Sequence, residues 1–293
     1  MAYAFYPGCV SRGGCPELYP AAKMVCEKLN IELAELTDVG CSGAGVLSQE
    51  VSDPINARTL AKVERMGMTM MTICSTCQGV FTQANHRLKS YAERRERINR
   101  EYLASEGLEY KGTVDVKHFL WVLDEEYGLD KLKGQVVRPL AGLKVAPFYG
   151  CYLRRPPELM MPKGFERRRS VLENTVEALG GEVVRISGRS KCCGFPILSS
   201  NEDASLSMCG DHTLEARQKG ADCVVTPCPL CHLELDGKQA DAEKHKHENI
   251  DMPILHLPQL VGLALGFSPK EMGLDKHLVS TEDVVKKLEA IRT

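Results

Sequence analysis

The segment Ala4-Phe5-Tyr6-Pro7-Gly8-Cys9 returns later in the chain as Pro147-Phe148-Tyr149-Gly150-Cys151. Thr72-Ile73-Cys74 is likewise matched by Thr226-Pro227-Cys228. The matching cysteines are 142 residues apart at the first pair and 154 residues apart at the second. A repeat at nearly constant offset indicates two copies of one folding unit of about 140 residues.

The repeat divides the chain into a first unit, residues 1–141 with its linker, and a second unit, residues 142–293. A chain of 293 residues exceeds the usual size of one hydrophobic core, so we expect two cores. The segment from about Ala104 to Gly142 is the expected connection between the units. The formal net charge of −2 gives no basis for a nucleic-acid partner.

Apolar runs and helix boundary signals alternate along each unit. In the first unit we expect strands at Ala2–Tyr6, Ile31–Leu36 and Met68–Ile73, and helices at Pro16–Asn30, Pro54–Gly67 and Gln78 to about Ser105. In the second unit we expect strands at Leu143–Tyr149, Glu182–Ile186 and Cys223–Thr226, and helices at Arg167–Leu179, Asp203–Lys219 and from about Leu230. This alternation predicts an α/β fold of two similar domains, each with a small parallel sheet flanked by helices.

Nine of the thirteen cysteines occupy matching positions in the two units. They are Cys9, Cys41, Cys74 and Cys77 in the first unit and Cys151, Cys192, Cys193, Cys228 and Cys231 in the second. Each follows the carboxyl end of an expected strand, which is where open α/β sheets bind ligands. Helix N-termini in these loops favour the thiolate form of cysteine. The pattern predicts one thiolate site at each sheet end.

The N-terminus, Met1 to Tyr6, has no basic region followed by an apolar one, and no run of eighteen apolar residues occurs in the sequence. We therefore expect a cytoplasmic protein. In that reducing compartment, thirteen cysteines indicate metal or redox chemistry rather than a disulfide framework.

A tetrahedral zinc ion is one candidate for each set of cysteines, and it implies a colourless scaffold that docks partners. Three features favour iron–sulfur chemistry instead. The cysteines are separated by 31 and 32 residues in the first unit and by 40 and 34 in the second, whereas structural zinc sites use compact pairs. The second unit also has five thiols, one more than zinc needs, and soft thiolates suit iron–sulfur centres.

A cysteine, a long interval, Cys192-Cys193-Gly194, a second long interval and Cys228-Pro229-Leu230-Cys231 resemble a CCG domain. Two such domains in tandem resemble the B subunit of heterodisulfide reductase, and the resemblance extends through Leu255-His256-Leu257-Pro258-Gln259-Leu260. It implies a noncubane [4Fe–4S] cluster held by Cys151, Cys192, Cys193, Cys228 and Cys231. In that family such a cluster is where a disulfide is reduced or thiols are oxidised.

The first unit departs from the pattern because Cys41-Ser42-Gly43 has a hydroxyl in place of one thiol. Its four remaining cysteines suit a [2Fe–2S] or a cubane [4Fe–4S] cluster, and Cys15 is a candidate replacement ligand. We therefore expect the second unit to react with substrate and the first to relay electrons. Cys193 and His232 are the candidate catalytic residues, with His232 protonating a sulfur. Three other cysteines are expected in the core, namely Cys26, Cys209 and Cys223.

No nucleotide-binding glycine motif is present, so electrons must pass to or from another subunit. The resemblance implies a ferredoxin-like iron–sulfur subunit and, beyond it, a flavoprotein, with a thiol or disulfide as substrate. The alternative is the CCG subunit of a succinate dehydrogenase or fumarate reductase, which exchanges electrons with quinone. In that alternative the apolar stretch Ile254–Phe267 lies on a membrane. Without a flanking basic face, we expect it to pack at the domain interface instead.

Overall fold

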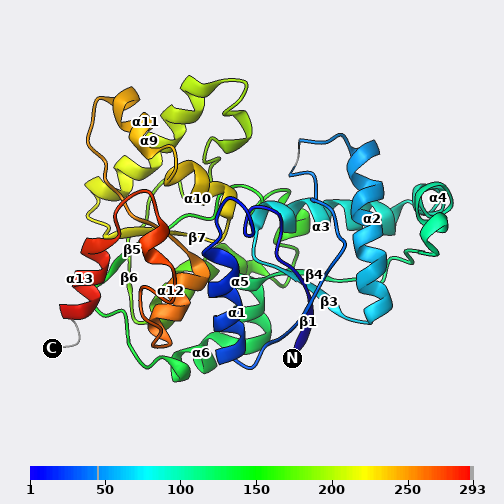
Figure 1. Cartoon of the computed structure of the whole chain (residues 1–293), viewed down its shortest axis with the longest axis horizontal. Coiled ribbons are helices and arrows are strands. Elements are labelled where there is room, and N and C mark those ends of the chain that lie inside the picture. The colour runs from blue at the N-terminus through cyan, green and yellow to red at the C-terminus, as the bar shows by residue number, and fades with distance from the viewer. Residues whose placement is uncertain (45, 291–293) are drawn as a thin grey trace.

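The computed structural model describes residues 1–44 and 46–290. They form two four-stranded sheets flanked by helices, with strand orders β2-β1-β3-β4 and β6-β5-β7-β8 (Figure 1). Every neighbouring pair of strands is parallel. The predicted α/β fold with a duplicated parallel sheet is confirmed.

The strands of the first sheet are β1 (Ala2–Tyr6), β2 (Glu32–Glu35), β3 (Thr69–Thr72) and β4 (Val116–His118). Its helices are α1 (Leu18–Lys28), α2 (Gln49–Met66), α3 (Ser75–Ser90), α4 (Ala92–Ile98), α5 (Phe119–Trp121) and α6 (Leu129–Gln135). The strands of the second sheet are β5 (Lys144–Pro147), β6 (Glu182–Val183), β7 (Cys223–Thr226) and β8 (Ile254–His256). Its helices are α7 (Pro157–Met160), α8 (Val171–Ala178), α9 (Glu202–Gln218), α10 (Pro229–Leu235), α11 (Gln239–Lys246), α12 (Leu257–Ala264) and α13 (Glu282–Ala290).

All six expected strands are present, but each sheet has a fourth strand that the sequence pattern missed. Strand β4 lies within the segment expected to be only a connection, and β8 opens the apolar stretch before α12. The expected long helix is also interrupted. Tyr91 has an extended backbone between α3 and α4, and the Arg95 guanidinium donates to the Leu88 carbonyl, which the break leaves free.

In each sheet the first strand lies between the second and the third. The chain therefore adds strands first on one side and then on the other, and the direction switches between β1 and β3 and again between β5 and β7. Loops on either side of such a switch point diverge at the carboxyl ends of the strands and leave a crevice for a ligand. The cysteines that follow β1, β3, β5 and β7 lie in these loops.

The helix after each fourth strand packs on the other unit. Helix α12 of the second unit packs against α1 of the first, and α5 and α6 of the first pack against α8 of the second. Figure 1 shows α1, α5 and α12 in the middle of the molecule, with α2 and α4 at one end and α9 and α11 at the other. All eight residues of α12 are buried, so the expected packing of this stretch at the interface is confirmed.

Two clusters of buried apolar side chains are present, as expected, but the expectation that they divide between the two units is wrong. One cluster of buried apolar side chains joins Phe5 and Val25 to Val145 and Leu260, and a second cluster also includes residues of both units. The physical reason is the reciprocal helix packing, because apolar faces of α1 and α8 are covered by helices of the opposite unit.

Candidate metal centre

Three loops at the end of each sheet carry the nine cysteines. A threonine ends the third strand of each sheet, and its hydroxyl accepts a hydrogen bond from the amide of the first CxxC cysteine. The distance is 3.3 Å both for Cys74 N to Thr72 Oγ1 and for Cys228 N to Thr226 Oγ1. These bonds fix the start of α3 and of α10 against the sheet, so that each CxxC motif begins a helix.

The first-unit thiols form two contacts. The Cys9 and Cys41 sulfurs are 3.6 Å apart and both residues are exposed. Cys74 and Cys77 are buried, and the Cys77 amide donates to Cys74 Sγ at 3.5 Å. Ser42 is 1% exposed, and its hydroxyl lies 3.4 Å from Cys77 Sγ. The serine therefore lies in the thiol group, at the place that the second cysteine of a CCG motif occupies.

The second-unit thiols are close enough to shift one another's pKa. Cys192 interacts with Cys151 and Cys193, Cys193 with Cys231, and Cys231 with Cys228. All thirteen cysteines lie among the described residues, and none of them is in a disulfide. Five free thiols thus converge at the carboxyl ends of β5, β6 and β7.

A glycine stands directly before the first cysteine of each set. Gly8 has φ +83° and Gly150 has φ +68°, a conformation that L side chains rarely adopt. A Cβ at Gly150 would lie 2.8 Å from Cys231 Sγ, and one at Gly8 would lie 3.5 Å from Cys77 Sγ. The chain therefore needs glycine at residue 150 to keep space beside Cys231, whereas a Cβ at Gly8 would make an ordinary contact with Cys77 and only the positive φ there favours glycine.

The two sets of thiols meet at the interface between the units. The interaction with Cys228 of the second CxxC motif is the main cause that raises the pKa of Cys74 in the first. Thr76 Oγ1 of the first unit lies 3.4 Å from Cys228 Sγ. The Pro227 carbonyl, just before Cys228, accepts from Ser75 Oγ at 3.1 Å and from His118 Nε2 at 3.0 Å. The second CxxC motif is thus positioned by side chains of the first unit.

The thiols perturb one another because neighbouring sulfurs must share protons. Hydrogen bonds from Cys151 and Cys193 hold the pKa of Cys192 well below its usual range. The hydrogen bond to Cys192, followed by burial, raises the pKa of Cys151, and the hydrogen bond to Cys192 also raises that of Cys193. Burial, together with the hydrogen bond to Cys41, raises the pKa of Cys9 to about 11. Several such thiols ionise together only when a cation balances their charge.

No lysine or arginine among the described residues supplies that positive charge at hydrogen-bonding distance. In residues 1–44 and 46–290, none of the nine sulfurs is hydrogen-bonded to a lysine or arginine side chain. Soft thiolates without a protein cation are the ligands of iron–sulfur clusters and of zinc. The residues present therefore fit a metal centre in each unit.

A cavity of about 260 Å³ opens beside the second-unit thiols. Cys151, Cys193, Cys228 and Cys231 line it. The rest of its wall is apolar or carries hydroxyl groups, and includes Val46, Tyr152, Phe195 and Leu198. None of the residues that line it, among those the structure describes, has a charged side chain at neutral pH apart from the thiols themselves.

Two residues that the sequence predicts at the thiol sites lie outside them. His232 is 4% exposed, does not line the cavity and faces Cys15, with 3.9 Å between His232 Nδ1 and Cys15 Sγ. Cys15 is buried, its sulfur lies near the Pro229 carbonyl and His232 Nδ1, and Ser42 holds the position that Cys15 was a candidate to fill. The three cysteines expected in the core are buried: Cys26, Cys209 and Cys223.

The sequence analysis missed the side chains that act between the units. These side chains are Thr76 and His118. A signal for His118 is present in the repeat, because Lys117-His118-Phe119 and Leu255-His256-Leu257 both place a histidine where a fourth strand passes into a helix.

Comparison with known families agrees with this geometry. Residues 3–82 and 145–236 each match the CCG model, described as a cysteine-rich domain. The chain belongs to the CCG cysteine-rich domain family. The two matches contain all nine of the cysteines that converge at the sheet ends.

Three relatives of this CCG protein are similar over nearly their whole length. The 8-methylmenaquinol:fumarate reductase membrane anchor subunit of Wolinella succinogenes is 38% identical and aligns over 94% of this chain and 96% of its own. The B subunit of the ferredoxin/F(420)H(2)-dependent CoB-CoM heterodisulfide reductase of Methanosarcina acetivorans is 32% identical over 97% of this chain and 96% of its own. A protein of Archaeoglobus profundus that is named as similar to the heterodisulfide reductase B subunit is 30% identical over 93% of each chain. The resemblance to the B subunit of heterodisulfide reductase is confirmed.

A crystal structure of a hypothetical protein from Helicobacter pylori has the same fold, with a TM-score of 0.78 and 16% identity. The alignment covers 95% of this CCG protein and 52% of that chain, so this protein spans about half of its length. Among the described residues, no helix combines the length and the apolar character that a membrane crossing requires.

Proposed function

We propose that this chain is the iron–sulfur subunit of a heterodisulfide reductase-like complex. The second-unit thiols would hold a noncubane [4Fe–4S] cluster at which a substrate reacts. The four first-unit thiols would hold a second cluster, [2Fe–2S] or [4Fe–4S], that relays electrons. The contact between Thr76 Oγ1 and Cys228 Sγ, 3.4 Å apart, carries the proposal, because it joins the CxxC motif of the first unit directly to that of the second.

The difference in exposure between the two sites supports electron transfer from the first-unit site to the second-unit site. Cys9 and Cys41 are exposed, so a ferredoxin-like iron–sulfur subunit can approach the first site closely. The second-unit thiols instead face the cavity, which admits a small substrate and limits water. Electrons that enter at the first site would reach the second through the paired CxxC motifs.

The proposed reaction breaks one sulfur–sulfur bond. A disulfide takes up two electrons from the partner subunit and two protons, and leaves as two thiols; thiol oxidation is the reverse. Bound clusters supply the one-electron redox steps. The chain itself holds the substrate among apolar side chains and provides hydroxyl groups of Thr76 and Tyr152 at the cavity wall. His232 does not line the cavity, so it could donate a proton to the substrate only by way of other groups that relay the proton.

A second candidate function is electron exchange with a quinone. The uncharged cavity wall favours it, since a substrate with sulfonate, phosphate or carboxylate groups would need cationic partners there. The Wolinella succinogenes relative, 38% identical, is named for a menaquinol reaction. Both functions use the same two thiol sites and differ only in what enters the cavity.

The test uses anaerobically purified full-length protein. Metal and sulfide analysis comes first: about six to eight irons with sulfide support the proposal, and zinc without sulfide supports a non-redox scaffold instead. Reoxidation of the dithionite-reduced protein is then followed by EPR after addition of an uncharged disulfide or a water-soluble quinone. The substrate that reoxidises the clusters defines the function.

The matched variants are Cys193→Ser, which removes a cavity thiol, and Cys26→Ser, which removes a buried cysteine far from the site. We expect the first to lose reoxidation and the second to retain it. Full reoxidation in a Cys193→Ser protein that has lost the second-unit cluster would refute the proposal.

A further inference from the structure

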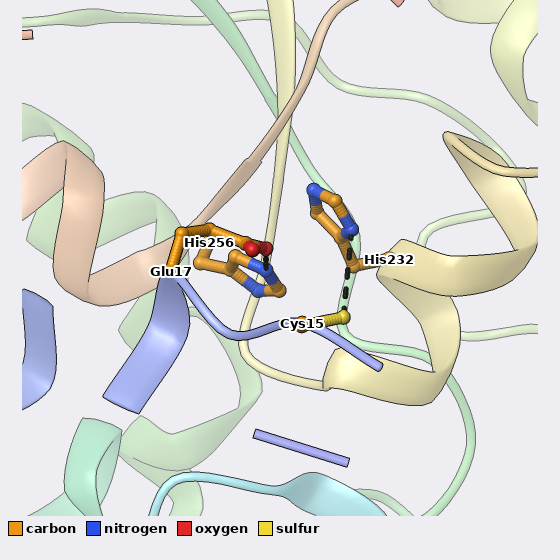
Figure 2. Close-up of side chains that lie close together, drawn as sticks. All are labelled: Cys15, Glu17, His232 and His256. Atoms are coloured by element: carbon orange, nitrogen blue, oxygen red, sulfur yellow. Dashed lines mark hydrogen bonds and ion pairs between the residues drawn. The ribbon is translucent and has the colours of Figure 1, made fainter. Parts of the chain in front are cut away.

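A second group of metal-ligating side chains lies between the units, apart from the nine cysteines. Figure 2 shows Cys15, Glu17, His232 and His256 gathered at one point. One ligand atom from each of them lies within 4.8 Å of the other three. All four residues are buried, with exposed fractions of 1%, 5%, 4% and 1% in that order.

The four residues come from both units. Cys15 and Glu17 lie in the turn that leads into α1, His232 is on α10, and His256 ends β8 at the start of α12. The Glu17 carboxylate is 2.9 Å from His256 Nε2, so one close pair already joins the first unit to the second. A Cβ at Gly273 would lie 2.7 Å from the Glu17 side chain, which shows how closely the later loop covers this pair.

We propose that Cys15, Glu17, His232 and His256 bind one zinc ion that holds α1 of the first unit to α10 and α12 of the second. One thiolate, one carboxylate and two imidazoles are all ordinary zinc ligands. The site uses none of the nine cysteines assigned to the iron–sulfur clusters; with zinc bound, His232 is a metal ligand and no longer a candidate proton donor for the substrate.

The hydrogen bonding of His232 prepares one of its nitrogens for a metal. His232 Nε2 lies 3.1 Å from the Ile254 carbonyl, which can only accept, and 3.5 Å from His277 Nδ1, so the tautomer with its proton on Nε2 satisfies that carbonyl. Nδ1 therefore presents its lone pair toward Cys15 Sγ, 3.9 Å away. Metal-binding histidines characteristically donate their other ring N–H to a carbonyl or carboxylate in this way.

Charge also favours a divalent cation. Within the described residues, Glu17 makes no ion pair with a lysine or arginine, and its side chain is paired only with His256. A buried carboxylate needs a partner charge or a metal. Two neutral imidazoles, one carboxylate and one thiolate together balance the charge of one zinc ion, and binding releases the thiol proton.

The distances require a small rearrangement. Zinc ligands at about 2.0–2.3 Å from the metal lie about 3.3–3.8 Å from one another at tetrahedral corners, so the four atoms must close in by less than about 1 Å each. The His232 and His256 rings are stacked, with centroids 3.9 Å apart and planes 18° from parallel. Because an imidazole nitrogen binds a metal in its ring plane, zinc binding must open this stack.

Zinc K-edge X-ray absorption on the full-length protein, grown with added zinc, tests the proposal without any substitution. We expect about one zinc per chain, with one sulfur at about 2.3 Å and three nitrogen or oxygen ligands at about 2.0–2.1 Å. A four-sulfur shell, which would place zinc at the CxxC cysteines, overturns the proposal. A zinc content near zero also overturns it, whatever the iron content.

Variants then assign the ligands. Glu17→Gln preserves volume and hydrogen bonding while it removes the charge, and His256→Gln removes a ligand; each should lower zinc content at least tenfold. Cys26→Ser, a buried α1 residue outside the group, should keep zinc at the unsubstituted level. Full zinc in Glu17→Gln would overturn the assignment. Iron content, measured on the same samples, reports separately on the clusters and on folding.

Discussion

The hydroxyl of Thr76 should set the reduction potential of the second-unit cluster from across the unit interface. Thr76 is 5% exposed, and its Oγ1 lies 3.4 Å from Cys228 Sγ. A sulfur bound to iron carries no proton, so the hydroxyl donates and the sulfur accepts. Reduction adds negative charge to the sulfur and strengthens this bond, and hydrogen bonds to ligand sulfurs are known to tune cluster potentials.

Thr76→Val keeps the shape of the side chain and removes only the donor. A hydrogen bond to a charged group contributes about 1.5–3 kcal/mol, and we assign about 1 kcal/mol of that to the gain on reduction. Since about 1.4 kcal/mol corresponds to about 59 mV for one electron, the potential of the second-unit cluster should fall by about 40 mV. The first-unit cluster should keep its potential.

An EPR-monitored redox titration measures both potentials in one sample. Thr59→Val is the matched control, because Thr59 is also buried and its hydroxyl donates to the Ile55 carbonyl, 3.3 Å away, rather than to a sulfur. It should leave both potentials unchanged. A Thr76→Val potential that stays within about 10 mV of the unsubstituted protein, or that rises, would refute the reasoning.

Three further predictions concern the cysteine frame and its support. Gly150→Ala should abolish the EPR signal of the second-unit cluster, since the new Cβ would lie 2.8 Å from the Cys231 sulfur. Gly67 also has a positive φ, +63°, but has open space around it, so Gly67→Ala should keep the signal. Loss of the signal in both variants would contradict the prediction. Ser42→Cys should supply a fifth first-unit thiol and change the EPR signal of the first-unit cluster, and an unaltered signal would exclude the hydroxyl from the ligand position. Asp53→Asn should lower the free energy of unfolding by on the order of 3 kcal/mol in urea titrations, because the fully buried Asp53 carboxylate pairs with two arginines. Asp38 is also paired with an arginine but is exposed, so Asp38→Asn should have much less effect. Equal effects of the two substitutions would count against the argument.

Local patterns in the sequence identified most of the secondary structure. Strands β1 and β7 have the expected bounds because each is a short apolar run with clear limits. The fourth strands were missed because β4 and β8 are short and each runs directly into a helix, so no turn residue marks where the strand ends. The interruption at Tyr91 was also missed, since neither glycine nor proline marks it and the compensating bond comes from Arg95.

For the candidate site too, some features could be predicted from the sequence and others could not. The repeated spacing of the cysteines, together with the strand expected before each one, was sufficient to predict a group of five thiols in the second unit and of four in the first. Ser42 lies beside the first-unit thiols. Spacing carries information here because parallel strands end at one sheet edge, whatever packs around it. By contrast, the proposed catalytic role of His232 rested on its position next to Cys231, and the side chain points toward Cys15 instead.

A duplicated α/β fold with one set of thiols at the end of each sheet can therefore be inferred from the order of the residues. Three contacts depend instead on the packing of the two units: Thr76 lies against Cys228, α12 packs on α1, and Cys15 and Glu17 lie against His232 and His256. The physical reason is the range of the interactions. Strands and caps depend on neighbouring residues, whereas these contacts depend on how two units bury their remaining apolar faces against each other.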